Sequence, residues 1–260
     1  EWRDEDVQRR VSERMQRGKR KTWITGEEST GIFCIIHSGR HVYCTGRICD
    51  IYSWGHLTAA GCTITKPIMA FAFASALSLV VMAGAELFTG NNFVMAAGSF
   101  MGQVSWANTV KVWVVCYLGN LVGALLGAVM FVAAGVPTGT VGEFFANTAA
   151  TKMGGAAGQL FVKGIMCNLM VCLAVWCCTK MKTESGKLIM IFWCIFIFMV
   201  CGFEHSIANM SVMAIGLMSP NGVAGLTVAG YFHNLLWVTL GNIIGGSIFV
   251  ALPYYLIQKK

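Results

Sequence analysis

Long apolar stretches are the feature that most limits what this chain can fold into. An α-helix needs about 20 apolar residues to cross a bilayer, and five stretches approach or exceed that length. Segments rich in Gly, Pro, Asn, Ser and Lys separate them. The stretches are 67–87, 110–134, 158–179, 188–203 continuing to 218, and 229–257. The sequence therefore predicts an all-α protein that crosses a membrane several times.

The charges support this division of the chain. Charged residues make up 12% of the sequence, about half the share that is usual in soluble domains, and most of them precede Pro67. We therefore distinguish a charged N-terminal segment, 1–66, from a membrane domain, 67–258. Because both signs are mixed in the charged segment, the net charge of +7 does not indicate a nucleic-acid partner.

Cysteine usage argues against disulfides and metal. The chain has 11 Cys and no C-x-x-C pair, and at least seven of the cysteines lie in apolar stretches, where a free Cys acts as a small hydrophobe. We expect no zinc site, no other metal and no cofactor.

The lysines predict the orientation in the membrane. By the positive-inside rule, lysine-rich segments lie in the cytoplasm, which places the loop 180–187 and the C-terminus there. The segment 135–157 carries only Lys152 and Glu143, so we interpret it as a loop on the outside. The predicted location is the cell (inner or plasma) membrane, in a multi-pass arrangement.

Two octapeptides interrupt the apolar stretches in the same way. GAELFTGN at 84–91 and GFEHSIAN at 202–209 share Gly, Glu and Asn at their first, third and eighth positions. Each is followed by an apolar stretch too short to span, 91–104 and 206–218. The pattern predicts a helix, a break at 84–92 or 202–209, and then a half-helix, with the broken backbone buried in protein or lining a cavity.

A second pair of motifs extends this symmetry. LGNLVG at 118–123 is similar to LGNIIG at 240–245, and each follows a break motif at a comparable distance. Matching broken helices in two inverted halves are the best sequence indication of a transport site near the membrane midplane. The alternative is that both pairs are ordinary small-residue packing motifs.

Three ionisable side chains lie within the breaks. Glu86 and Glu204 occupy matching positions, so we expect them to share a structural role at the helix breaks with Asn91 and Asn209. His205 has no counterpart in the first octapeptide, and histidine changes its charge near physiological pH. We therefore expect His205 to relay protons or to bind an anion.

These motifs, together with IMCNLMVCLAVW at 165–176, resemble the formate/nitrite transporter family over about residues 67 to 258. The resemblance implies a channel or transporter and no enzyme. It implies a six-helix protomer with an aquaporin-like inverted repeat of three-helix halves, assembled as a homopentamer with one pore per protomer. It also implies small monovalent anions as substrates, such as formate, nitrite, hydrosulfide or lactate, often passing with a proton.

The resemblance assigns functional positions to this sequence. His205 matches the central pore histidine, Thr89 the threonine that faces it, Asn168 the pore asparagine, and Lys152 a vestibule lysine that attracts anions. Without the resemblance, Lys152 would be read as an interfacial anchor. Four further positions match the apolar constrictions of the pore, although apolar residues at helical spacing usually pack: Phe73, Leu77, Phe88 and Phe198.

A bare anion pays a high desolvation cost in a narrow apolar pore. We therefore expect formate to pass as neutral formic acid after taking a proton from water or from His205. Nitrite and hydrosulfide are alternative substrates.

Two other classes of membrane protein fit the sequence less well. A neutral-solute channel of the aquaporin type should show Asn-Pro-Ala turns, and neither break contains Pro. A haem enzyme would need pairs of His on facing helices.

The N-terminal segment departs from the family pattern. The family has a first membrane helix before the stretch 67–87, whereas no uncharged stretch within 1–66 reaches the length of a span; 29–39 and 51–65 are the longest. One interpretation is a frameshift near residue 60, which would leave a non-functional chain without its first helix. The other is a genuine soluble extension followed by five spans.

Overall fold

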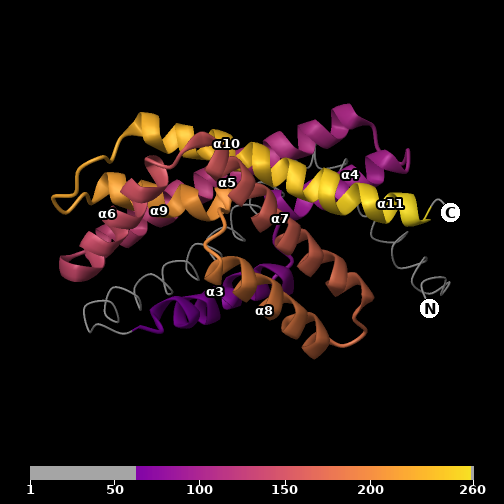
Figure 1. Ribbon diagram of the computed structural model, residues 1–260, viewed down its shortest axis with the longest axis horizontal. Helices are drawn as coiled ribbons and strands as arrows, with labels where there is room; N and C mark the ends of the chain where they lie inside the picture. The colour runs from indigo at the N-terminus through magenta and orange to yellow at the C-terminus, as the bar shows by residue number, and fades with distance from the viewer. Residues whose placement is uncertain (1–62, 259–260) are drawn as a thin grey trace.

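The computed structural model describes residues 63–258, and this part of the chain is built of helices without β-strands (Figure 1). A five-residue π-helix, η2 (Ser247–Ala251), joins the last two helices into one long rod. The helices in chain order are α3 (Thr65–Met82), α4 (Phe88–Phe100), α5 (Trp106–Ala133), α6 (Gly139–Met153), α7 (Ala157–Lys180), α8 (Glu184–Val200), α9 (Ser206–Met218), α10 (Val228–Gly246) and α11 (Leu252–Gln258).

Four helical segments of this region are long and apolar enough to cross a membrane. They are α3, α5, α7 and the continuous rod from α10 to α11, and they coincide with four of the predicted stretches to within a few residues. The fifth stretch, 188–218, consists of α8 and the half-helix α9. The half-helix expected at 206–218 is confirmed with the same bounds, whereas its counterpart α4 begins three residues and ends four residues earlier than the expected 91–104.

The interpretation of 135–157 as a loop is wrong, because most of it forms α6. This helix is too short to span and carries polar residues on its outer face. Its apolar residues recur at helical spacing, and they pack against α9. The docking of this apolar stripe stabilises a helix that the pattern of membrane spans does not reveal. The buried residues are Val141, Gly142, Phe145, Ala146, Ala149 and Met153.

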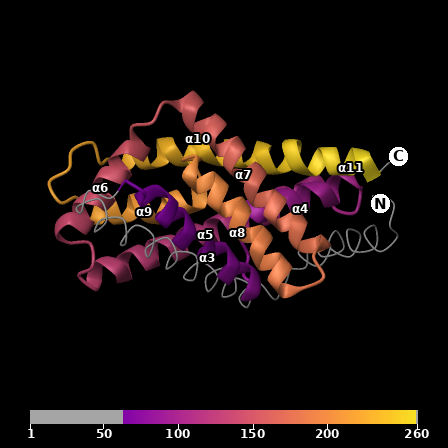
Figure 2. The same ribbon diagram turned by 60° about the horizontal axis from the view of Figure 1, so that its bottom comes forward.

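The helices form two related halves. In the first, α3 and α4 form a broken helix that is followed by α5; in the second, α8 and α9 form the matching broken helix, followed by α10. Helices α3 and α8 lie side by side in both views (Figures 1 and 2). The half-helices cross over: α4 packs on α10 and η2, and α9 packs on α5 and α6. Any counterpart of α7 in the first half would precede residue 63, outside the described residues.

Helices α7 and α10 make the closest pairing, and glycines allow it. A Cβ on Gly164 of α7 would lie 2.8 Å from the carbonyl oxygen of Val238 on α10. Gly241 and Gly245 of the motif LGNIIG face α7 in the same way, so that any side chain there would strike the backbone of α7. The motif therefore serves close helix packing, and its asparagine has a separate role that is described below.

Candidate functional site

The first glycine of each octapeptide ends a helix. Gly84 and Gly202 have φ values of 71° and 68°, in the left-handed region where glycine avoids a steric penalty. At the first break the N–H groups of Gly84 and Ala85 donate to carbonyls at the end of α3, and the corresponding residues of the second break do the same at the end of α8. This is the Schellman arrangement. It explains why the chain stops being helical at 83–87 and 201–205, segments shorter than the octapeptides.

The shared glutamate and asparagine form a side-chain pair in each break. Asn91 Nδ2 donates to Glu86 Oε2 at 2.9 Å, and Asn209 Nδ2 donates to Glu204 Oε2 at 2.6 Å. In each pair the carboxylate lies in the break and the amide lies in the first turn of the half-helix. The pairs therefore fasten each break to the half-helix that follows it.

The asparagine of each LGN motif holds the backbone of its break. Asn120 Oδ1 accepts the N–H of Phe88 at 3.0 Å, and its Nδ2 donates to the carbonyl of Glu86 at 3.2 Å. Asn242 likewise accepts the N–H of Ser206 at 2.9 Å and donates to the carbonyl of Glu204 at 3.1 Å. Both amides are fully buried. They satisfy backbone groups that the helix breaks leave without helical partners.

His205 and Thr89 bring the two breaks together. The Thr89 hydroxyl and His205 Nε2 are 3.0 Å apart, although 116 residues separate them in the chain, and both side chains are buried. The other ring nitrogen, Nδ1, accepts the N–H of Ala208 at 3.1 Å and so caps α9. Because Nδ1 accepts, the neutral ring carries its proton on Nε2, the nitrogen that faces Thr89.

Asn168 completes this centre from α7. Its Nδ2 donates to the carbonyls of Thr89 and Asn242, at 3.3 and 2.6 Å, and so ties α7 to α4 and α10. Its Oδ1 is buried and accepts no hydrogen bond from the part of the chain that the structure describes. A buried amide oxygen without a partner is costly, so this oxygen is an acceptor available to a guest molecule.

Aromatic side chains cover the His205 centre. Phe198 of α8 stacks on the imidazole with a centroid distance of 6.2 Å, and Phe73 of α3 meets Phe198 edge-on at 5.9 Å. On α3, Met69 and Leu77 lie one turn to either side of Phe73; Met69 lines one cavity and Leu77 lines another. One face of α3 therefore runs from cavity to cavity, with buried aromatic rings between them.

The fourth residue expected at a constriction, Phe88, begins α4 and is buried edge-on against Tyr117 of α5 at 5.0 Å. It adjoins Thr89 in the chain and Leu87, which lines the same cavity as Leu77. Phe88 is thus next to the centre, and its ring packs toward α5.

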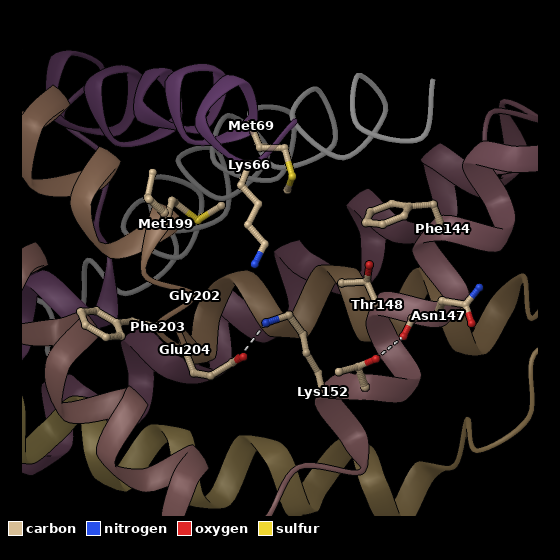
Figure 3. Close-up of a pocket in the computed structure, with 12 residues that line it drawn as sticks. Lys66, Met69, Phe144, Asn147, Thr148, Lys152, Met199, Gly202, Phe203 and Glu204 are labelled. Carbon is tan, nitrogen blue, oxygen red and sulfur yellow. Dashed lines mark hydrogen bonds and ion pairs between the residues drawn. The ribbon is translucent and has the colours of Figure 1, made fainter. Parts of the chain in front are cut away.

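The first cavity, of about 370 Å³, opens beside the second break (Figure 3). Lys152 of α6 enters it and forms an ion pair with Glu204 at 2.7 Å; the two side chains are only 12% and 11% exposed. Asn234 links Asn209, the partner of Glu204, to the backbone of Lys152. The pair is therefore part of a closed network that joins α6, α9 and α10.

The second cavity, of about 200 Å³, lies beside the first break. Glu86 and Asn91 form its polar part, and its apolar wall comes from the end of α3 and from Val175 of α7. Each break thus opens to its own cavity, and the Thr89–His205 contact lies where the two breaks meet. In the described part of the chain, no group of three or more His, Cys, Asp or Glu side chains is placed to hold a metal ion.

Sequence reasoning found the motifs and missed some of the contacts. It assigned Lys152 to a vestibule without recognising its ion pair with Glu204, and it did not single out Asn234. It treated LGNxxG as a packing motif, although Asn120 and Asn242 hold the breaks. The recurrence of Asn in both copies was a sign of that role, because packing alone requires only the small residues.

An interior of broken helices tied by buried amides, with a cavity at each break, defines a membrane channel or transporter. The sequence comparisons agree. The family model described as "Formate/nitrite transporter" matches residues 31–256. The chain is 39% identical over 201 residues to the nitrite transporter NirC of Escherichia coli (strain K12), covering 74% of this chain and 72% of that protein. The chain therefore belongs to the formate/nitrite transporter family, whose members are channels and transporters and not enzymes.

Solved structures support the same conclusion. A structure described as "FNT family ion channel" superposes with a TM-score of 0.89 at 30% identity, over 96% of this chain and 99% of that one. Another, described as "Pentameric formate channel with formate bound", gives a TM-score of 0.77 at 26% identity, over 90% of this chain and all of that one. The expected aquaporin-like inverted repeat is confirmed by this likeness.

The family match also begins earlier than the motif resemblance. The motifs place its start near residue 67, whereas the family model matches from residue 31. Residues 1–62 lie outside the described part of the structure, so the two interpretations of the segment 1–66 stay predictions.

Proposed function

We propose that this chain is a channel for small monovalent anions, formate foremost, that pass in a proton-linked step at His205. The observation that carries the proposal is the buried contact of 3.0 Å between Thr89 and His205. It joins the two breaks at the point where aromatic rings separate the two cavities.

Desolvation explains why a proton takes part. An ion loses its hydration in a narrow apolar passage, and the cost is far larger for an ion than for a neutral molecule. The rings of Phe73 and Phe198 present such a passage, whereas formic acid is a small neutral molecule that passes it at lower cost. The first cavity concentrates the anion, and protonation removes its charge before the rings.

The tautomer of His205 supports a role for this residue as a hydrogen-bond donor in this step. Its Nε2–H faces Thr89 and donates to an incoming anion, while Nδ1 is held by Ala208. If the ring gave up this proton, it would need another at Nδ1, and the hydrogen bond to Ala208 would be lost. Water is therefore the favoured proton source, and His205 acts as the hydrogen-bond donor that holds the anion. Asn168 Oδ1 accepts the O–H of the neutral acid.

Formate and nitrite have the same bent shape, with two oxygens on one central atom, so the site distinguishes them weakly by geometry. Formic acid is the weaker acid of the two, and its neutral form is available under milder conditions. This favours formate in a proton-linked pore. The identity to NirC, whose name specifies nitrite, favours nitrite as the second candidate, and hydrosulfide is a further alternative.

We extend the proposal to assembly and orientation. The formate channel of the second solved structure is pentameric, and this chain exposes large apolar side chains along α5, α8 and α10 that suit contact with lipid or with other protomers. We propose a homopentamer in the cell membrane with one pore per protomer. By the positive-inside rule, Lys180, Lys182 and Lys187 support a cytoplasmic loop between α7 and α8, and with it a cytoplasmic C-terminus.

Flux into proteoliposomes tests the function. Formate, nitrite and hydrosulfide would be compared at neutral and at mildly acidic external pH. We expect formate to pass fastest and its flux to rise as the external pH falls. A preference for nitrite would make nitrite, and not formate, the proposed substrate. A formate flux that does not change with pH would overturn the proton-linked step. No flux of any of the three anions would contradict the proposal as a whole.

A further inference from the structure

The charges of the first cavity do not support the expectation that Lys152 attracts anions. Among the described residues that line this cavity, three carry charge: Lys66, Lys152 and Glu204. The ammonium of Lys152 lies 2.7 Å from the Glu204 carboxylate. The two charges of a close pair largely cancel at a distance of several ångströms. The pair therefore contributes little net attraction for an anion that approaches the cavity.

Lys66 differs from Lys152 in its exposure and in its charge partners. It is an exposed residue of the first turn of α3, and among the described residues it forms no ion pair. Its side chain extends into the cavity from the side opposite α6, toward the Lys152–Glu204 pair (Figure 3). The described lining of the cavity therefore carries one net positive charge, which is that of Lys66.

The position of Lys66 in its helix is also unfavourable for stability. The amino end of a helix carries a partial positive charge, so a lysine in the first turn destabilises it. No side chain in the described part of the chain caps α3 at this end, and the helix therefore adds its own positive potential to that of Lys66. The stability of α3 does not explain a lysine at this position, whereas the attraction of anions does.

We propose that Lys66 is the residue that draws anions into the first cavity, and that Lys152 mainly positions Glu204 at the break. The inference rests on the proposed function, since it assigns the attraction of that substrate to a residue. The opposite wall offers the Thr148 hydroxyl (Figure 3), while Asn147 and Thr151 donate to the backbone of their own helix. An anion between Lys66 and Thr148 meets both a charge and a hydrogen-bond donor.

Charge-selective labelling tests the inference without requiring transport. Thr148→Cys introduces a thiol on the cavity wall, and its reaction rates with an anionic and a cationic methanethiosulfonate reagent report the local potential. The same protein without Thr148→Cys supplies the background of native thiols. We expect Lys66→Gln to lower the ratio of anionic to cationic rates by about three- to tenfold, the effect of one unit charge in a wet cavity, and Lys66→Arg to preserve it.

Two controls separate Lys66 from the other charges. Lys111→Gln removes the same charge from α5, away from the cavity, and should leave the ratio unchanged. The double variant Lys152→Gln/Glu204→Gln removes the pair at constant net charge and should also leave it unchanged. The inference is overturned if Lys66→Gln has no effect on the ratio, or if the double variant abolishes the preference for the anionic reagent.

Formate flux then relates the inference to function. We expect Lys66→Gln to raise the KM for formate by about three- to tenfold and to leave the flux at saturating formate unchanged. A loss of saturating flux at constant KM would contradict the inference. If the wild type carries no anion while its labelling ratio depends on Lys66, the proposed function fails and the assignment of the cavity charge stands.

Discussion

At His205 a structural role and the proposed functional role meet in one side chain. Nδ1 caps α9 through the N–H of Ala208, and Nε2 contacts Thr89 across the junction of the two breaks. Loss of transport after any drastic substitution of His205 would not tell these roles apart. A replacement that keeps the cap and removes the donor at Nε2 does so.

His205→Asn is that replacement, because Asn is among the best N-cap residues and is too short to reach Thr89 as histidine does. We expect the thermal unfolding temperature in detergent to stay near that of the wild type. Formate flux should fall on the order of tenfold, the equivalent of one lost hydrogen bond of about 1–1.5 kcal/mol. His205→Leu, which removes both contacts, serves as the comparison and should lower stability as well. Undiminished flux in His205→Asn would refute a role for the Nε2 donor.

The breaks were predictable because their chemistry recurs in the sequence. A glycine that ends a helix, a carboxylate that accepts from an amide five residues later, and a distant asparagine that holds the backbone are needed at both breaks. Each residue therefore occurs twice, at matching positions. The contact of Thr89 with His205 has no second copy, and only the family resemblance pointed to it.

Contacts between elements were harder to predict from the sequence. Helix α6 was missed because a short helix docked on a neighbour needs only a narrow apolar stripe, which is a weaker pattern than a membrane span. The ion pair of Lys152 and Glu204 depends on how α6 docks on α9, and no spacing in the sequence encodes a contact between residues 52 positions apart. Lys66 lies opposite α6 because α3 packs on α8, which the sequence does not encode either.

The pairing of α7 with α10 leads to a prediction at the scale of elements. A Cβ on Gly241 would strike the backbone of α7 at Phe161 and Gly164, and backbone does not move aside as a side chain does. We expect Gly241→Ala to destabilise the protein by about 1–3 kcal/mol or more. Thermal unfolding in detergent would measure the loss.

Gly158→Ala is the matched control, because Gly158 also lies in α7 and a Cβ there would meet nothing within 4 Å. Alanine favours a helix over glycine by up to about 1 kcal/mol, so this variant should be as stable as the wild type or slightly more stable. Equal stability of the two variants would contradict the close packing of α7 on α10.

In the whole molecule, the two cavities lie on opposite sides of the point where the breaks meet. The first cavity is lined by α6 and by the amino end of α3, and the second by the carboxyl end of α3 and by Val175 near the end of α7. The lysine-rich loop 180–187 follows α7 directly. By the positive-inside rule, we expect the second cavity to face the cytoplasm and the cavity with Lys66 and Lys152 to face outside.

Sidedness is tested with thiols placed on the two faces. Asn147 is exposed on the wall of the first cavity, and Glu184 is exposed in the first turn of α8, beside the lysine-rich loop. A membrane-impermeant thiol reagent should label Asn147→Cys in right-side-out vesicles and Glu184→Cys in inside-out vesicles, above the background of the native cysteines. The reverse pattern would invert the orientation, and the anion would then be drawn in from the cytoplasm, because the net positive charge stays with the first cavity in either orientation.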